Sequence, residues 1–513
     1  MNNRQLIAVC LSLVMGTEFV YSQAPTQPSS ENSASSGKSL ERPILKEDLQ
    51  LRPFVYRPID PEFWSKIEEL ERLRNYIEIL IQGTARMNET TQGTPEFAEG
   101  KYATALALFH LDLVGAATYT FLQIAQEQIG TRVGEAALHY LGRLDAEKNT
   151  DRSAIEQVLV AGEFGPLHPH IQSFVSYHKG MYSLRYNLKW ADDHFKKVTP
   201  DTYWGFERLY LSALSEISRG RADVGRKIIE QLYANKMTPA PLLKRMALQV
   251  ARFKFEDEEF MAAIKIYDTL ADAPVREKGR VLLERAWAQY YQKEYSKALG
   301  ILKALEAPYF TSSLTFERHV LTMIIYKDLC YYGAVAQTAK VFRQAFSSAL
   351  RDIKKRQRLV DNPILAQMAL NHARLRDRAN YIDQLRRESI LFEQLGFKAL
   401  PFYQQLLNYY ENRDKELQLV LAHELEQKVH EIANELLDVE EQVQFIEYSA
   451  QLDSLRILRE GENYRYYRPE QINYYGFDRI YWPVESEFWS DELDHYKVLS
   501  PSRCGDSNEN YTQ

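Results

Sequence analysis

Two stretches of the chain, 251–270 (ARFKFEDEEFMAAIKIYDTL) and 286–305 (AWAQYYQKEYSKALGILKAL), align without a gap. In both, an alanine is followed nine positions later by an aromatic residue and twelve positions later by a second alanine. Every matched pair is 35 residues apart, so the stretches are consecutive copies of one unit. The spacing predicts two antiparallel helices that approach closely at the alanines. Because one such hairpin cannot bury its apolar face alone, the units must stack.

The same spacing continues, less regularly, on both sides. Small residues expected on second helices recur at intervals of 34, 38, 35 and 36 residues: Ala191, Gly225, Ala263, Ala298 and Ala334. We therefore predict an all-α fold in which degenerate helix-turn-helix repeats form a solenoid over 95–410, clearest in 175–345. The alternative is an irregular helical domain whose small residues fall at regular spacing by accident.

This spacing resembles the tetratricopeptide repeat (TPR), a 34-residue helix-turn-helix with small residues at its eighth and twentieth positions. Ala251, Ala263, Ala286 and Ala298 match those positions, and Tyr295 matches the aromatic residue before the second of them. The tryptophan and glycine of the family's first helix are poorly kept, so the repeats are degenerate. The resemblance implies a scaffold that binds other proteins.

A heptad pattern replaces the repeat in the last third of the chain. Apolar or small residues alternate in steps of three and four over 422–457, interrupted at Asp453. The pattern predicts one long, coiled-coil-like helix over 414–460, with an apolar seam that needs a partner. That partner is a second copy, a different protein, or another helix of this chain, for which we favour 364–395.

Both ends of the array are rich in aromatic residues. The predicted C-terminal tail, 461–513, is irregular and includes Tyr-Trp-Pro and Phe-Trp steps, and the N-terminal segment 45–94 has similar character near Phe54 and Trp64. A free tail would not carry so many large rings, since exposed apolar surface is sticky. We predict that both segments cover the ends of the array.

The first residues predict export. Arg4 precedes the apolar run LIAVCLSLVMG, and a small residue, Ser22, stands before Gln23, so 1–22 reads as a signal peptide. The alternative is a permanent N-terminal anchor. Residues 23–44 are Ser- and Pro-rich and predict a flexible linker. We expect the processed chain in the periplasm, with association to the outer membrane as a further expectation.

Charge excludes one class of partner. The chain has 63 basic and 70 acidic residues, a formal net charge of −7, and its charges are interspersed. A nucleic-acid binder is expected to carry a basic face, so we predict no nucleic-acid partner.

Removal of the signal peptide leaves two cysteines, Cys330 and Cys504. An even number in an oxidising compartment predicts a disulfide that ties the tail to the last clear repeat, and two unpaired thiols are the alternative. The segment YWPVESEFWSDEL (481–493) and Leu329-Cys-Tyr-Tyr332 are similar to envelope TPR proteins of the myxobacterial type, including components of adventurous gliding motility. That resemblance favours the Cys330–Cys504 bond.

Catalytic motifs are weak or missing in the sequence. Residues 220–227 have the glycine spacing of a phosphate loop but lack its Lys-Ser/Thr ending and a preceding strand. His168 and His170, and likewise His423 and His430, lack the companions of a metal site. After the array, little room is left for a compact catalytic domain. We predict no cofactor, no metal and no small-molecule substrate.

The sequence therefore predicts a non-catalytic scaffold of the cell envelope that binds protein partners. Partner-contacting side chains are expected off the small-residue core, and the predicted set is Arg252, Lys254, Trp287, Gln289 and Tyr291. Two alternatives stay open. One is a peptidoglycan hydrolase, or its regulator, that uses the solenoid as a scaffold. The other is a structural oligomer that self-associates through 422–457.

Overall fold

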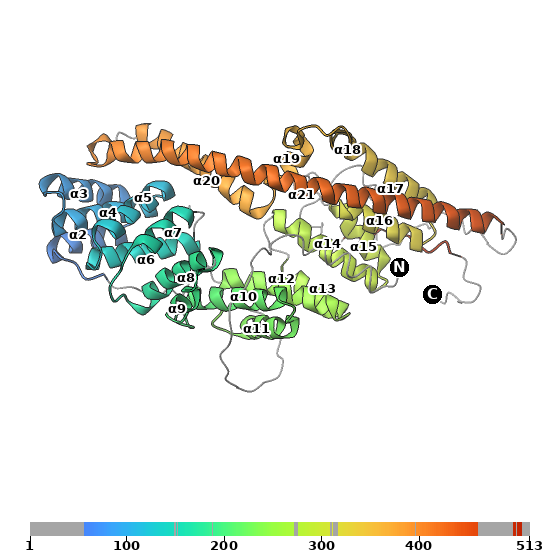
Figure 1. Ribbon diagram of the computed structural model, residues 1–513, viewed down its shortest axis with the longest axis horizontal. Coiled ribbons are helices and arrows are strands. Elements are labelled where there is room, and N and C mark those ends of the chain that lie inside the picture. Colours follow the sequence, from blue (N-terminus) through green and yellow to red (C-terminus); the bar gives the residue numbers. More distant parts are fainter. Residues whose placement is uncertain are drawn as a thin grey trace, which may run out of the picture. The chain divides into compact units, whose positions relative to one another are not determined.

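The computed structural model describes residues 56–147, 150, 152–186, 188–270, 275–307, 310, 316–394, 397–459, 496–498 and 500–504. Regular structure in these residues is helical throughout, without a strand, which confirms the predicted all-α class (Figure 1). The predicted signal peptide, the linker 23–44 and most of the predicted tail lie outside the described residues.

The chain divides into two compact units. The N-terminal unit is described from Tyr56 to Met246 and again over 376–422, and the C-terminal unit comprises 247–375 and the chain from His423 onward. The division falls inside three helices, α12 (Ala240–Glu256), α20 (Ala373–Gln394) and α21 (Tyr403–Arg459). Each of these helices therefore contributes residues to both units.

Helices of the N-terminal unit follow one another at short intervals. They are α2 (Pro61–Arg72), α3 (Tyr76–Glu89), α4 (Pro95–His110), α5 (Val114–Glu127), α6 (Arg132–Glu147), α7 (Arg152–Ala161), α8 (Pro169–Arg185), α9 (Ala191–Phe195), α10 (Tyr203–Ser218), α11 (Ala222–Ala234) and most of α20 (Ala373–Gln394), with a 3₁₀ turn at Phe397–Ala399.

The C-terminal unit contains the remaining helices. They are α13 (Phe260–Asp268), α14 (Val275–Tyr291), α15 (Tyr295–Ala304), α16 (Glu317–Asp328), α17 (Tyr332–Ala345), α18 (Ser347–Lys354) and α19 (Pro363–Leu370), with a 3₁₀ turn at Leu359–Asp361. Successive helices such as α3 and α4, or α14 and α15, contact each other, and alternate helices such as α4 and α6, or α14 and α16, also touch.

Local sequence signals set several helix starts. The Asp60 carboxylate accepts hydrogen bonds from the backbone N–H groups of Glu62 and Phe63, and Pro61 occupies the first helical position. Thr94 caps α4 in the same way. These side chains satisfy N–H groups that have no partner inside a helix, so the helix begins at a defined residue.

The small residues lie where two helix backbones approach. Ala251, Ala263, Ala286 and Ala298 have no exposed surface. At Gly225 on α11, an added Cβ would overlap the carbonyl oxygen of Ala213 on α10. Ala213 and Gly225 show the twelve-residue spacing seen in the sequence. The two helices can approach this closely because only a small side chain fits between their backbones.

One turn geometry recurs between paired helices. In the C-terminal unit it is centred on Glu258, Lys293 and Cys330, whose φ angles are 62°, 60° and 59°. At Lys293, its own N–H donates to the Tyr290 carbonyl (2.8 Å) and the next N–H, of Glu294, donates to Gln289 (3.0 Å). This pair of bonds is the Schellman motif that ends a helix with one left-handed residue.

The N-terminal unit uses the same turn. Its left-handed residues are Arg74, Asp112 and Gly220, with φ angles of 55°, 62° and 79°. Each makes the same two hydrogen bonds, for example Asp112 N–H to Phe109 (3.2 Å) and Leu113 N–H to Leu108 (3.0 Å). Helix pairs in both units therefore reverse direction by one device.

The heptad stretch belongs to one helix, α21, which begins at Tyr403 rather than at Asp414. Its seam is buried inside the C-terminal unit, at Val429, Leu436, Val439, Val443 and Ala450. Ion pairs beside the seam connect α21 to α16, α17 and α18: Lys327–Asp453 (3.3 Å), Arg343–Glu447 and Lys354–Glu440 (3.1 Å).

These flanking pairs lie at 440–453 of α21, whereas the favoured stretch 364–395 meets α21 at Arg374, which pairs with Glu424 at 2.7 Å. The rest of α20 lies in the N-terminal unit, where the buried Glu388 carboxylate accepts from the Gly115 and Ala116 N–H groups (2.9 and 3.2 Å) and from the Tyr410 hydroxyl (2.9 Å). The α20 helix thus caps the start of α5.

Replacing Lys293 by glycine is expected to raise the free energy of unfolding by about 1 kcal/mol. A left-handed conformation costs an L-residue roughly 1–2 kcal/mol, and glycine's larger unfolded-state entropy offsets only part of that gain. Urea unfolding followed by circular dichroism measures the change. Gln292→Gly, one position earlier and without a positive φ, is the control and should destabilise. Equal changes in the two variants would contradict the assigned turn.

Candidate partner-binding surfaces

The five residues predicted to contact a partner lie on α12 and α14. Three of them are buried: Arg252, Trp287 and Gln289 are 6%, 4% and 6% exposed. The other two, Lys254 and Tyr291, are partly exposed. Partner contact by this set stays a prediction, and only Lys254 and Tyr291 offer surface for it.

Arg252 forms a buried ion pair that joins α12 to α14. Its Nε and Nη2 donate to the two carboxylate oxygens of Glu284 at 3.0 and 2.7 Å, and the Tyr267 hydroxyl donates to the same carboxylate at 3.1 Å. Burial alone raises the pKa of Glu284, but Arg252 and Arg280 outweigh it and hold that pKa below its ordinary value. A bidentate ion pair fixes the relative orientation of its two side chains, so Arg252 holds α12 against α14.

Trp287 is held by a second carboxylate. Its indole N–H donates to Glu317 Oε1 on α16 at 2.8 Å. Removal from water raises the pKa of Glu317 to about 7, and the negative charges of Glu284 and Glu435 act in the same direction. These effects outweigh the Trp287 hydrogen bond and the charge of Arg280, which lower it. Trp287 therefore links α14 to α16.

Lys254 and Tyr291 make contacts at the helix ends. Lys254 pairs with Glu259 across the turn that follows α12, at 3.0 Å. Tyr291 stacks on Phe260 with ring centroids 5.1 Å apart and planes 10° from parallel. Both residues lie beside turns that reverse the chain, where side chains remain accessible from outside.

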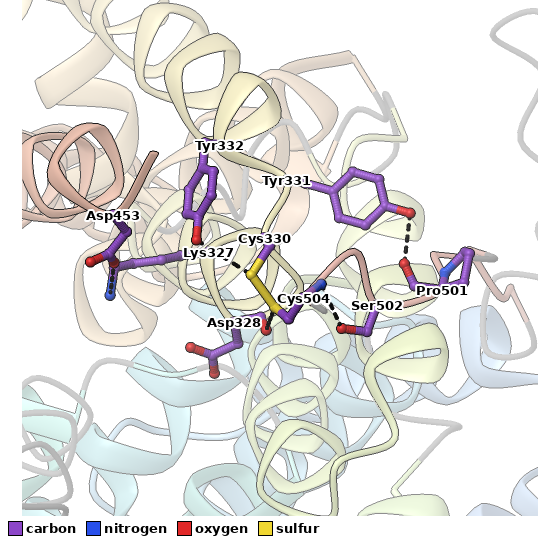
Figure 2. Close-up of a disulfide and its surroundings, with 9 residues drawn as sticks. All are labelled: Lys327, Asp328, Cys330, Tyr331, Tyr332, Asp453, Pro501, Ser502 and Cys504. Atoms are coloured by element: carbon purple, nitrogen blue, oxygen red, sulfur yellow. Dashed lines mark hydrogen bonds and ion pairs between the residues drawn. A yellow bond between two sulfur atoms is a disulfide. The ribbon is translucent and has the colours of Figure 1, made fainter. Parts of the chain in front are cut away.

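Cys330 and Cys504 are joined to each other by a disulfide. Their Cα atoms lie 5.3 Å apart, and the pairing is the one predicted from the cysteine count. Cys330 occupies the left-handed position of the turn between α16 and α17 (Figure 2). Figure 2 also shows Lys327, on the last turn of α16, reaching Asp453 of α21. The segment that contains Cys504 is thus fixed to the corner where α16, α17 and α21 meet.

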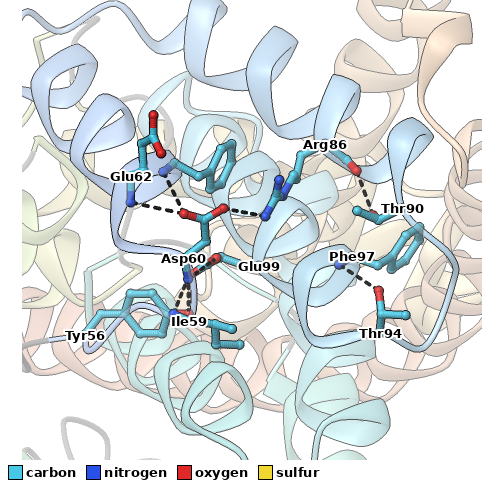
Figure 3. A network of polar contacts seen from close by, with 10 residues as sticks. Tyr56, Ile59, Asp60, Glu62, Arg86, Thr90, Thr94, Phe97 and Glu99 are labelled. Carbon is cyan, nitrogen blue, oxygen red and sulfur yellow. Dashed lines mark hydrogen bonds and ion pairs between the residues drawn. The ribbon is translucent and has the colours of Figure 1, made fainter.

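A polar network closes the described start of the N-terminal unit (Figure 3). Glu99 on α4 accepts from the Tyr56 hydroxyl (3.0 Å) and from the Ile59 and Asp60 N–H groups (2.9 and 3.1 Å). Asp60 also pairs with Arg86 at 2.6 Å. The segment before α2 is therefore attached to α4 by hydrogen bonds to one buried carboxylate.

Histidines and carboxylates do not gather into a metal site in the part of the chain that is described, where no group of three His, Cys, Asp or Glu side chains is suitably placed. The rings of His168 and His170 stack with centroids 5.6 Å apart. His178 Nε2 lies 3.3 Å from the buried Asp145 carboxylate, and its ring packs against Trp204. His178 and Asp145 thus form part of the packed interior of the unit.

Comparison with known proteins gives no relative. No family model, no curated protein and no solved structure matches this chain. The likeness to tetratricopeptide repeats therefore depends on the repeat spacing, and the narrower likeness to gliding-motility proteins stays a prediction. None of the described helices contains an apolar stretch long enough to cross a membrane.

One apolar surface was missed by the sequence reasoning. Phe445, Tyr448, Leu452 and Leu455 of α21 are 66%, 60%, 38% and 54% exposed. Steps of three, four and three residues place them on one side of the helix, away from the buried seam. A second heptad series alongside the first is the signal that could have revealed this exposed stripe.

Glu317→Gln is expected to remove a pH dependence of stability. The pKa of Glu317 is raised in the folded chain, so its protonated form stabilises the fold. That stabilisation is fully present below pH 4.5 and is lost as pH rises through 7. At pH 8 the variant should be more stable by about 1–3 kcal/mol, since one pKa unit equals ~1.4 kcal/mol. Urea midpoints at pH 5 and pH 8 measure this difference.

Glu306→Gln is the matched control, because Glu306 lies in an exposed pair with Lys303. It should leave the difference between the two pH values as it is in the parent chain. A parent and a Glu317→Gln variant with the same pH dependence would contradict the assignment.

Proposed function

We propose that this protein is an exported, non-catalytic scaffold of the cell envelope, whose TPR-like helix pairs hold a protein partner. The observation that carries the proposal is the repeated turn. The left-handed residues Asp112, Gly220, Glu258, Lys293 and Cys330 stand in equivalent positions, and the last four are 38, 35 and 37 residues apart. A period of that length is typical of stacked helical hairpins, which bind partner helices or extended peptides.

The disulfide supports the proposed compartment. Stable disulfides form in exported proteins and are rare where thiols are kept reduced. The Cys330–Cys504 bond therefore agrees with the signal peptide predicted for 1–22 and with a periplasmic location. Association with the outer membrane and a role in gliding motility are finer proposals, which rest on the resemblance of the tail sequence alone.

Internal pairing of the buried charged groups favours a scaffold over a hydrolase. The buried carboxylates Glu99, Glu284 and Glu388 each accept several hydrogen bonds from their own unit, so they serve packing. Hydrolysis of a glycan strand needs an acid and a second carboxylate on either side of a bound sugar. A peptidoglycan hydrolase would therefore have to use other carboxylates as its catalytic pair.

Photo-crosslinking in cells tests the scaffold. A benzophenone amino acid in place of Lys254 or Tyr291 should give crosslinks to one envelope protein, identified by mass spectrometry, whereas the exposed control position Lys340 on α17 should not. A clearing band from the purified protein on a gel containing sacculi would contradict the non-catalytic assignment. Identical crosslinks from all three positions would contradict partner binding at Lys254 and Tyr291.

The exposed stripe of α21 favours a second candidate, a structural oligomer. The seam predicted for self-association is largely buried within the C-terminal unit, but Phe445, Tyr448, Leu452 and Leu455 present a second apolar side. Two such stripes from two copies could pack as a coiled coil.

Sedimentation distinguishes this second candidate. Phe445→Ser combined with Leu455→Ser should shift an oligomer to the monomer, because both side chains would lie in the helix–helix contact. Gln451→Ser, an exposed polar position on the same helix, is the control. A parent chain that sediments as a monomer at all concentrations would exclude the oligomer.

A further inference from the structure

The last described residues lie in an extended path on the C-terminal unit. We call residues 496–498 and 500–504 the C-terminal strap. The Val498 N–H donates to the Ser296 carbonyl on α15 (3.0 Å), and the Arg503 N–H donates to the Leu329 carbonyl at the end of α16 (3.0 Å). Both of these bonds are made by main-chain groups, as in the binding of an extended peptide.

A glycine makes room for the strap. Gly300 is buried on α15, and an added Cβ would overlap the Tyr496 carbonyl. Gly300 stands two positions after Ala298, the small residue of its repeat. The equivalent residues of the other four repeats all carry a side chain and are all exposed: Asp193, Lys227, Lys265 and Ala336. Gly300 is the exception in this series, and the strap lies where a side chain would otherwise be.

A tyrosine contacts the other end of the strap. The residue that follows the left-handed turn position is Glu259 in one repeat, Glu294 in the next and Tyr331 here. The Tyr331 hydroxyl donates to the Pro501 carbonyl at 2.8 Å (Figure 2). The Arg503 guanidinium lies 4.1 Å from the centroid of the Tyr331 ring. A cation at that distance from an aromatic face is attracted to it.

The geometry points to a peptide-binding trough, formed by Ser296, Gly300, Leu329 and Tyr331, which the chain's own strap fills and the Cys330–Cys504 bond secures. The occupant it fits is an extended segment that offers main-chain N–H groups to two carbonyls and an arginine to the tyrosine ring. The strap is thus an internal ligand, and a peptide of the same chemistry can take its place once the disulfide is broken and the strap has left. This inference does not depend on the proposed scaffold function.

The chemistry of release is a thiol–disulfide exchange. One thiolate of a dithiol reductant attacks a sulfur of the Cys330–Cys504 bond and forms a mixed disulfide, and its second thiol displaces the protein sulfur. The protein gains two thiols and the reductant becomes a cyclic disulfide. Both cysteines are partly exposed, so the bond can be reached from solvent.

Reduction alone does not empty the trough, because the strap remains attached to the chain at millimolar effective concentration. The test therefore uses the full-length chain with a recognition site for a specific protease placed within 461–495. The folded, oxidised protein is cut, and then reduced with dithiothreitol and passed through a desalting column. Binding of a fluorescent peptide, YKVLSPSRS (496–504 with Cys504 replaced by serine), is followed by fluorescence anisotropy.

The cut and reduced protein should bind the peptide saturably, and the cut but oxidised protein should not, since its own strap is still bonded. Gly300→Lys, which introduces the residue that the preceding repeat has at Lys265, should weaken binding at least about tenfold. Tyr331→Ala should weaken it less, through loss of the ring. Ala336→Lys, at the equivalent exposed position of the next repeat, is the control and should bind as the parent does.

Absence of saturable binding by the cut and reduced parent would overturn the inference, because the strap would then be held by its covalent bond alone. Equal affinity of the parent and Gly300→Lys would overturn it too, because the peptide would then be binding elsewhere. Circular dichroism of each variant establishes that it is folded, and Tyr331→Ala provides a second measurement if Gly300→Lys is not.

Discussion

The distance of closest approach between paired helices is the constraint on which the rest of this structure depends. At Ala213 and Gly225 the backbones come so near that a Cβ on Gly225 would overlap a carbonyl oxygen. Ala251 and Ala263, and Ala286 and Ala298, hold the same positions in the next two repeats and are fully buried. Only small side chains permit that approach, and the bulkier neighbours are then brought into the interior between hairpins.

The turn between paired helices is the second half of the same constraint. A chain that must reverse direction within three or four residues ends its first helix with one left-handed residue. Five of the six residues described at this position carry a side chain, although glycine would fit with less strain. At Cys330 the side chain forms the disulfide with Cys504. The turn that the repeat requires thus also supplies the anchor for the end of the chain.

Buried charges add specificity to an interior that is otherwise apolar. Glu284 with Arg252, Glu317 with Trp287, and Glu388 with the start of α5 each join two helices that the small-residue contacts do not position. A carboxylate removed from water is stable only where its partners are in place, so each pair selects one arrangement of its helices. The raised pKa of Glu317 indicates that burial disfavours the ionised form of this carboxylate.

The sequence by itself determined the elements that depend on neighbours along the chain. These are the helix pairs, their period, the long helix around the heptad series and the pairing of Cys330 with Cys504. Each follows from local spacing or from the number of cysteines outside the predicted signal peptide. Only the tertiary structure decided which side chains are covered. Arg252, Trp287 and Gln289 looked available at their positions in the repeat, yet all three are buried, and the partners of the first two come from other helices. The same reason accounts for the exposed stripe on α21 and for Gly300, since burial and exposure are set by which helices and segments meet, and that is not encoded at any one position.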